Sequence, residues 1–158
     1  MSDEDCCQAV TLFQEYYNGQ GWRENQVYPG IPELLSDLRR AGRTLMVATS
    51  KPDAISHQIL EHFGLAEYFH HIQGAFQYES HCQKAAVIQK ALADCPYEGP
   101  AVMVGDREND CAGARENGLP TIGVLYGYGD RAELEAAGAA VIAEDVSHLG
   151  RILLEEGP

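Results

Sequence analysis

The sequence predicts an α/β fold in which helices cover both faces of a parallel sheet. Two observations support this prediction. Short apolar runs without alternation occur at 44–48 and 101–104, as in strands that are buried on both faces of a parallel sheet. Segments with helical spacing lie between and after these runs, so strands alternate with helices from residue 29 onward.

Two helices are expected before the first strand. The segment 6–18 has apolar residues along one side of a helix, and the glycines that follow end it. A polar stretch up to Tyr28 is expected to be a loop. A second helix is expected over 32–41, because Pro32 suits the first turn of a helix and Gly42 suits its end.

From residue 44 each expected strand is followed by an expected helix. Prolines and capping residues mark the helix starts, and glycines mark several of the ends. One such start is Asp130, which is expected to form a capping box with Glu133. The expected elements are strand 44–48, helix 52–62, strand 71–76, helix 83–93, strand 101–104, helix 107–116, strand 121–125, helix 130–138, strand 141–142 and helix 147–156.

The composition is that of a globular protein, and it excludes two classes of partner. Of the 158 residues, 45% are hydrophobic and 22% are charged. The net charge of −13 opposes nucleic-acid binding, which depends on Lys and Arg. No apolar run approaches the ~20 residues of a membrane span. We therefore expect neither nucleic acid nor a membrane as partner, whereas a small anionic substrate can still bind beside a bound cation.

The cysteines and the N-terminus predict a cytoplasmic location. Five cysteines are present, and no two of them form a C-x-x-C pair, so neither a disulfide framework nor a zinc site is indicated. The first five residues are acidic and polar, unlike a secretory signal. Reduced thiols in the cytoplasm explain both observations.

A pair of aspartates follows the strand expected at 101–104. Ligands of open parallel sheets bind beyond the carboxyl ends of the strands. Asp106 and Asp110 are four residues apart at the start of a helix, so they face the same side. Two carboxylates form a hard oxygen site suited to Mg²⁺. The alternative is that Asp106 only caps the helix and Asp110 lies on a solvated face.

Two hydroxyls and a lysine are further candidates. Thr49 and Ser50 follow the strand 44–48, just before a helix whose N-terminus favours anions, so they can bind phosphate. The alternative is that Ser50 simply caps this helix. Lys84 opens another helix, where a cation is electrostatically misplaced. It is therefore either an anion-facing or salt-bridged residue, or an ordinary surface lysine.

The order of these features resembles the haloacid dehalogenase superfamily of phosphatases. The features are a strand followed by Thr-Ser, a lysine before a helix, and a strand followed by Gly-Asp-x-x-x-Asp. The similarity is greatest to the phosphoglycolate phosphatase and 5′-nucleotidase-like branch, and it covers about residues 10–155. It implies a Rossmann-like core. The segments that carry it are 27–35, 47–52, 102–110 and 122–127.

The resemblance also implies roles for the candidate residues. Thr49 and Ser50 match phosphate-binding hydroxyls, and Lys84 matches a catalytic lysine that steadies the phosphoryl group and the nucleophile. Asp106 matches a ligand of Mg²⁺, the implied cofactor, and Asp110 its partner around the metal. In such enzymes an aspartate attacks a small phosphate monoester, and water hydrolyses the resulting aspartyl-phosphate.

The chain departs from the family pattern at its start. The family carries its nucleophile in a D-x-D-G-T stretch after a first strand, and this sequence has no such stretch. Asp3 and Asp5 have the spacing, but Met1-Ser2 cannot form the preceding strand and Cys6-Cys7 replaces Gly-Thr. We interpret these residues as a polar N-terminus. The chain is therefore expected to be truncated, without the nucleophile.

The departure also affects the domain organisation. Residues 1–26 match a remnant of the family's helical cap, namely its last helix and a linker, and residues 27–158 match the α/β core. Most of the cap and the central first strand are missing. That strand would lie between the strands that end at Ala48 and Val104. We expect that these two pair directly, that a partner chain or a second copy in a homo-oligomer supplies the missing strand, or that the fold is marginal.

Three hypotheses for function follow. The chain is a Mg²⁺-dependent phosphatase of small phosphate monoesters that needs a nucleophile segment from elsewhere, so its activity as an enzyme on its own is uncertain. Alternatively, it is a non-catalytic phosphate- or metal-binding or regulatory module derived from such a phosphatase. The third hypothesis is a fragment without function. Nothing in the sequence selects one phosphate ester as substrate.

Overall fold

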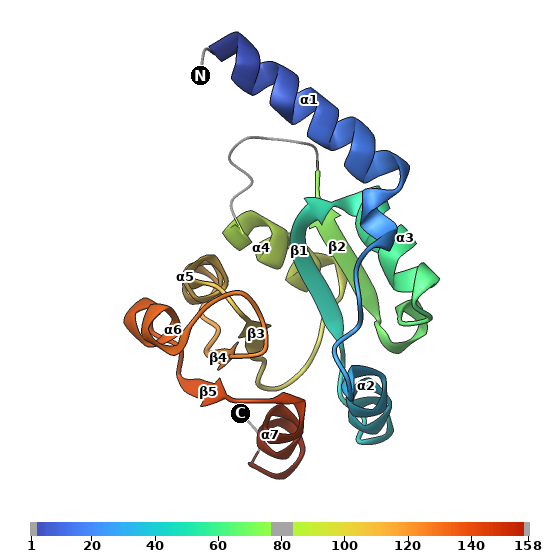
Figure 1. Cartoon of the computed structure of the whole chain (residues 1–158). Coiled ribbons are helices and arrows are strands. Elements are labelled where there is room, and N and C mark those ends of the chain that lie inside the picture. The colour runs from blue at the N-terminus through green and yellow to red at the C-terminus, as the bar shows by residue number, and fades with distance from the viewer. Residues whose placement is uncertain (1–2, 77–83, 157–158) are drawn as a thin grey trace.

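The computed structural model of the chain describes residues 3–76 and 84–156, and it confirms the predicted alternation of strands and helices (Figure 1). The strands are β1 (Met46–Pro52), β2 (His71–Ala75), β3 (Met103–Gly105), β4 (Thr121–Val124) and β5 (Val141–Ala143). The α-helices are α1 (Asp3–Gly19), α2 (Ile31–Arg40), α3 (Asp53–His62), α4 (Lys84–Asp94), α5 (Glu108–Glu116), α6 (Arg131–Ala137) and α7 (Val146–Arg151). Short helical turns are η1 (Gly21–Arg23), η2 (Ala66–Tyr68) and η3 (Ile152–Glu156).

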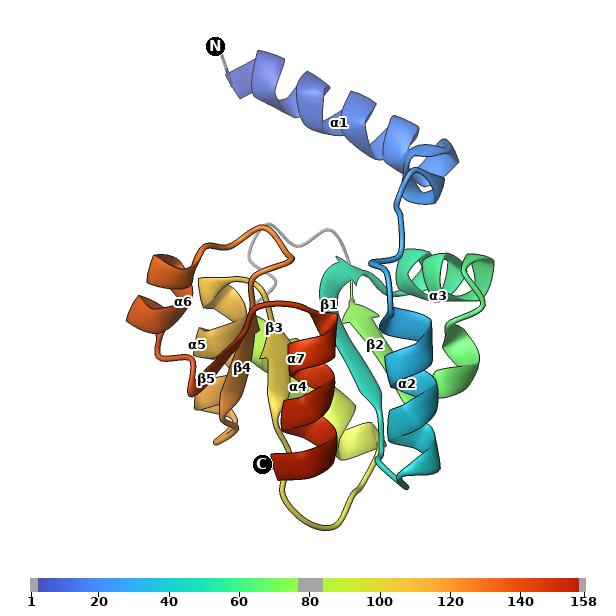
Figure 2. The ribbon, with the colours of Figure 1, turned by 60° about the horizontal axis from the view of Figure 1, so that its bottom comes forward.

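The described strands form two parallel sheets. One has the order β1-β2 and the other the order β3-β4-β5. β1 and β3 are therefore not paired, so the expectation of direct pairing between them is not met. Packing explains why: α4 packs on the β1-β2 sheet and against α5, while α2 contacts α7. These helices hold the two sheets side by side at a spacing that no ladder hydrogen bond bridges (Figure 2).

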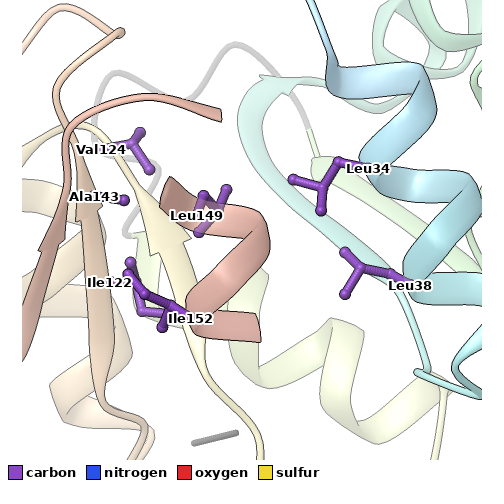
Figure 3. Close-up of a cluster of buried hydrophobic side chains, with 7 residues drawn as sticks. All are labelled: Leu34, Leu38, Ile122, Val124, Ala143, Leu149 and Ile152. Atoms are coloured by element: carbon purple, nitrogen blue, oxygen red, sulfur yellow. The ribbon is translucent and has the colours of Figure 1, made fainter. Parts of the chain in front are cut away.

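A cluster of buried apolar side chains joins the two halves. Leu34 and Leu38 point from α2 toward α7, which carries Leu149, and Ile152 follows in η3 (Figure 3). Side chains of the β4-β5 sheet complete the cluster, and Leu45 and Val104 are among the half-buried residues that pack against it. The core is thus continuous across the line where the backbone pairing is interrupted.

Helix α1 stands away from the α/β body (Figure 2). Its apolar residues Val10, Leu12 and Phe13 are exposed. The turn η1 connects it to the body, where buried Trp22 packs edge-on against His62 of α3. The assignment of residues 1–26 to a cap remnant stays a prediction. No helix in the described ranges is long and apolar enough to cross a membrane.

Candidate functional site

An ion pair links the N-termini of α4 and α5. Lys84 Nζ lies 2.8 Å from Asp110 Oδ1, and the two side chains are only 14% and 11% exposed. The other oxygen, Asp110 Oδ2, accepts hydrogen bonds from the backbone N–H groups of Asp106 at 3.0 Å and Arg107 at 3.2 Å. A Cβ on Gly113 of α5 would lie 2.9 Å from Lys84 Cγ, so a glycine there allows the two helices to approach. Lys84 is therefore not an ordinary surface lysine.

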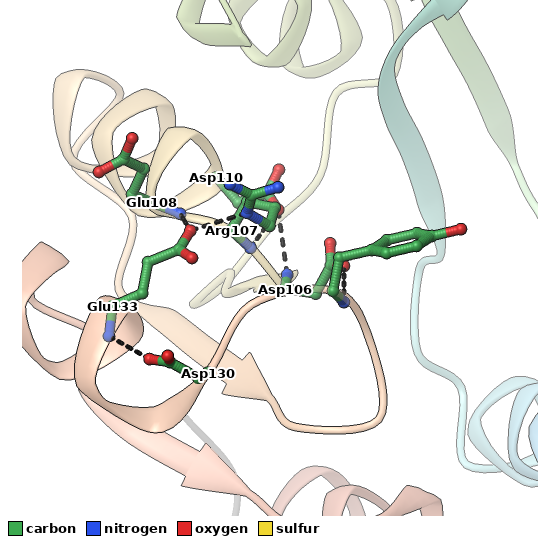
Figure 4. Close-up of polar contacts among 7 residues, drawn as sticks. Asp106, Arg107, Glu108, Asp110, Asp130 and Glu133 are labelled. Atoms are coloured by element: carbon green, nitrogen blue, oxygen red, sulfur yellow. Dashed lines mark hydrogen bonds and ion pairs between the residues drawn. The ribbon is translucent and has the colours of Figure 1, made fainter.

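The loop after β4 holds Asp106. Asp106 Oδ2 accepts a hydrogen bond of 2.8 Å from the backbone N–H of Tyr128 (Figure 4). A Cβ on Gly127 would lie 2.4 Å from the same oxygen, so only glycine lets the loop close over the carboxylate. The N-cap of α5 is Arg107, so the alternative that Asp106 caps this helix is wrong. The Asp106 carboxylate instead accepts from the Tyr128 N–H, and the N–H of Glu108 donates to Glu133.

A further ion pair, between Arg107 and Glu133, holds the start of α5 in place. Arg107 Nε lies 2.8 Å from Glu133 Oε1, which also accepts from the backbone N–H of Glu108 at 2.9 Å (Figure 4). The hydrogen bond from Arg107 is the main reason why the pKa of Glu133 is lowered. Only half of the expected capping box therefore forms: Asp130 accepts from the Glu133 N–H, while the Glu133 side chain turns to Arg107.

A half-buried tyrosine, Tyr126, lies near Asp106. Burial raises the pKa of Tyr126 to about 12, with smaller contributions from Tyr28 and Asp106. The rings of Tyr126 and Tyr28 meet edge to face with centroids 5.1 Å apart. The sequence alone does not identify Tyr126, Tyr128 or Glu133 as parts of the site. The available signal was Gly-Tyr-Gly at residues 127–129 after a strand, which on its own has many structural explanations.

The two predicted hydroxyls lie inside β1 rather than after it. Thr49 Oγ1 accepts a hydrogen bond of 3.2 Å from the backbone N–H of Lys51, and Ser50 is exposed. α3 begins at Asp53 with Pro52 as N-cap, so the alternative that Ser50 caps α3 is wrong. Neither hydroxyl is hydrogen-bonded to the lysine–aspartate group. Their position toward the carboxyl end of β1 is the one expected for ligand-binding residues.

The carboxylates fit a hard divalent cation only in part. Among the described residues, no group donates to Asp106 Oδ1, which leaves one oxygen for a cation. Both oxygens of Asp110 are occupied by Lys84 and backbone amides. No cluster of three metal-ligating side chains occurs in 3–76 and 84–156. This suits Mg²⁺, which often takes one or two carboxylates and completes its shell with water and substrate phosphate.

A hollow of about 720 Å³ lies elsewhere, along β2 between α3 and α4. Its lining includes His57, His71 and Asp94, and it contains none of the predicted site residues. The candidate site therefore lies outside this hollow.

Comparisons with known proteins identify the family of the chain. The model of the haloacid dehalogenase-like hydrolase family matches residues 2–124. A predicted phosphatase from Clostridium acetobutylicum, of known crystal structure, superimposes with a TM-score of 0.90 at 43% identity and covers 98% of this chain and 72% of its own. The 5′-nucleotidase of Pseudomonas aeruginosa is 37% identical over 150 residues, which are 92% of this chain and 66% of that protein. Phosphoglycolate phosphatases of Vibrio species are also relatives.

Tyrosine-protein kinase PtkA of Mycobacterium tuberculosis is also a relative, although its name gives a different activity. It is 41% identical over 127 residues, which are 80% of this chain and 44% of that protein. This chain thus spans less than half of PtkA and about two thirds of the nucleotidase. From the family match, the nucleotidase and phosphoglycolate phosphatase relatives and the shared fold, the chain belongs to the haloacid dehalogenase-like hydrolase family.

Proposed function

We propose that the chain is the larger part of a Mg²⁺-dependent phosphatase that hydrolyses small phosphate monoesters, in the manner of a phosphoglycolate phosphatase. The observation that carries the proposal is the Lys84–Asp110 ion pair next to Asp106. The Oδ2 atom of Asp106 accepts a loop N–H, and its Oδ1 atom has no hydrogen-bond donor among the described residues. Lys84 pairs with the carboxylate that accepts from the backbone N–H of Asp106, directly after the carboxyl end of β3. The names of the nucleotidase and phosphoglycolate phosphatase relatives support this substrate class.

Each residue has a defined task in this proposal. Asp106 holds Mg²⁺ through Oδ1, and Asp110 keeps Lys84 and the loop after β3 in place. Lys84 brings positive charge toward the phosphoryl group. Thr49 and Ser50 donate hydroxyl hydrogens to phosphate oxygens. The metal, when bound, neutralises charge on the transferring group. We find no aspartate among these residues that is free to attack phosphorus, so we propose that the nucleophile comes from another segment.

The first test measures ligand binding by the purified chain. Isothermal titration with inorganic phosphate, with and without Mg²⁺, is expected to show binding that depends on the metal. Asp106→Asn should remove this dependence, because it removes the anionic ligand of Mg²⁺. Asp130→Asn is the matched control, since Asp130 caps α6 and should leave binding unchanged. The assignment of the site would be overturned if phosphate bound equally well with and without Mg²⁺. It would also be overturned if both variants lost the Mg²⁺ dependence of binding to the same extent.

The second test measures hydrolysis of an aryl phosphate ester, with and without Mg²⁺. We expect no turnover by the chain alone, because the nucleophile is not among its site residues. Turnover that depends on Mg²⁺ and is abolished in Asp106→Asn would show that the chain contains a nucleophile, and that this part of the proposal is wrong. The alternative of a non-catalytic phosphate-binding or regulatory module predicts binding without turnover even when the missing segment is supplied.

A cytoplasmic location is also proposed. The four described cysteines, Cys6, Cys7, Cys95 and Cys111, are free, which supports a reducing compartment. Location of the tagged chain by subcellular fractionation tests this, and recovery outside the cytoplasmic fraction would contradict it.

A further inference from the structure

The loop that contacts Asp106 runs directly into α6. The Tyr128 N–H donates to Asp106 Oδ2 at 2.8 Å, and a Cβ on Gly129 would lie only 2.0 Å from the backbone oxygen of Asp106. The next residue, Asp130, is the N-cap of α6. The backbone and the carboxylate of Asp106 are thus both in contact with a segment that is fixed at the start of this helix.

A side chain of α6 binds the residues directly after Asp106. Glu133 Oε1 accepts a hydrogen bond from Arg107 Nε at 2.8 Å and another from the backbone N–H of Glu108 at 2.9 Å (Figure 4). Arg107 is the N-cap of α5, and Glu108 is its first residue. One carboxylate oxygen therefore holds the turn that carries Asp106 at the point where this turn enters α5.

Glu133 is well placed to hold this turn in one position. Its side chain is 24% exposed, although Arg107 itself is half-exposed, whereas Glu135 of the same helix is 57% exposed in its pair with Arg131. Water screens exposed pairs more strongly. The backbone of Glu133 is also fixed, because its N–H donates to Asp130 Oδ1 at 2.8 Å. The start of α6 and the start of α5 are therefore joined through this one side chain.

We infer that Glu133 is a positioning residue for the proposed metal site, which acts through Arg107 and the Glu108 N–H to hold the turn that carries Asp106. The inference rests on the proposed function, because it requires Asp106 to bind a divalent cation. Partners that orient a metal ligand typically change the metal affinity by about 10–100-fold when they are removed. In this role Glu133 acts through its neighbours and is not itself a ligand of the cation.

The alternative is that Glu133 affects the site only through its charge. A carboxylate attracts a cation and a guanidinium group repels it. A pure charge effect therefore predicts that removal of Glu133 weakens Mg²⁺ binding and that removal of Arg107 strengthens it. Positioning predicts weaker binding in both cases, because either substitution breaks the same contact of 2.8 Å. The opposite signs expected for Arg107 separate the two explanations.

The test measures Mg²⁺ binding to the purified chain by isothermal titration with the metal alone. We expect about tenfold weaker binding in Glu133→Ala. Glu133→Gln should lose less, because its amide oxygen can still accept from Arg107 and from the Glu108 N–H. Arg107→Ala should also weaken binding. The double variant should lose clearly less affinity than the product of the two single losses, because both substitutions remove the same contact.

Two control variants separate positioning from unrelated effects. Glu135→Gln removes a negative charge from the same helix and should leave the Mg²⁺ affinity unchanged, since Glu135 pairs with Arg131 and not with the turn after Asp106. Ile152→Val removes a methylene group from the apolar cluster and controls for a loss of stability alone. Urea unfolding of every variant shows that it is folded under the conditions of the titration, and Glu133→Gln serves if Glu133→Ala does not fold.

The outcomes separate this inference from the proposed function. Unchanged Mg²⁺ affinity in Glu133→Ala, or tighter binding by Arg107→Ala, would overturn the role of Glu133 and leave the phosphatase proposal in place. Equal losses in Glu133→Gln and Glu133→Ala, or an equal loss in Ile152→Val, would also overturn that role. Absence of Mg²⁺ binding by the parent chain would overturn both. The expected losses in a chain that does not bind inorganic phosphate with Mg²⁺ would uphold the role of Glu133 and overturn the phosphatase proposal.

Discussion

Lys84 Nζ lies 2.8 Å from Asp110 Oδ1, so one ion pair joins the first residue of α4 to the first turn of α5. Removing the lysine leaves a largely shielded carboxylate with only backbone partners. We expect Lys84→Met to lower the free energy of unfolding by roughly 1–3 kcal/mol, the cost of such an unpaired group. Urea unfolding of both proteins measures this difference.

The matched control is Lys90→Met. Lys90 pairs with Asp94 within the same helix, but these side chains are 40% and 39% exposed, so water screens the pair. Its loss should cost clearly less stability than the loss of the Lys84–Asp110 pair. Equal effects of the two substitutions would show that the Lys84–Asp110 pair is no more than a surface contact.

Gly127→Ala tests whether the loop after β4 positions Asp106. The added Cβ would lie 2.3 Å from Asp106 Cβ and 2.4 Å from Oδ2, so either the carboxylate or the loop has to move. We expect a loss of roughly 1–3 kcal/mol in stability, as for other overpacked positions. Mg²⁺ should then raise the melting temperature of the variant less than that of the parent chain, as thermal unfolding with and without the metal measures.

Gly19→Ala is the control for this substitution. A Cβ at Gly19 meets nothing within 4 Å, so stability should change by no more than about 0.5 kcal/mol. A Gly127→Ala variant that is as stable as this control, with an unchanged response to Mg²⁺, would contradict the positioning role.

Glu133 links stability to pH through Arg107. The hydrogen bond from Arg107 and that from the Glu108 N–H lower the pKa of Glu133 below its ordinary value of 4.5. A carboxyl with a lowered folded-state pKa stabilises the fold above its unfolded pKa, and this contribution is lost as the pH falls through the folded value. Glu133→Gln should therefore destabilise the chain at neutral pH and progressively less below pH 4.5. Urea unfolding across this range, beside Glu135→Gln on the same helix, checks the prediction, which a pH-independent difference would contradict.

The secondary structure could largely be predicted from the sequence, because its signals are local. Gly138 ends α6 in the left-handed conformation, and Asp130 caps its start, as their positions in the sequence indicate. The second half of the predicted capping box does not form, because the Glu133 side chain binds instead to Arg107 at the start of another helix. Propensities describe what a residue prefers within its own segment, so they do not contain such competition between segments.

The site was predictable in its residue types but not in its contacts. The spacing of Asp106 and Asp110 indicated two carboxylates on one side of a metal site, whereas the structure gives them different partners: Lys84 and amides for Asp110, and a loop amide for Asp106. The division of the strands into two sheets also depends on tertiary packing. The sequence pointed to a missing ladder partner, but only the arrangement of the helices shows that β1 and β3 do not close on each other.

Tyr126 provides a prediction at high pH. Burial, with Tyr28 and Asp106 nearby, raises its pKa from 10.0 to about 12, so the folded chain keeps this phenol protonated when an unfolded chain would ionise it. The neutral ring is favoured in the fold, and its contribution to stability is complete below pH 10 and is lost as the pH rises from 10 toward 12.

The measurement is an ultraviolet absorbance titration of the tyrosinate band. It is best done in a Tyr16→Phe background, because Glu24 also raises the pKa of Tyr16. We expect Tyr126→Phe to remove a late phase near pH 12, which Tyr128→Phe should leave in place because the ring of Tyr128 is 89% exposed. If the late phase survived in Tyr126→Phe, the half-buried phenol of Tyr126 would not be its source. The packing of Tyr126 against Tyr28 would then be looser than the edge-to-face contact at 5.1 Å implies.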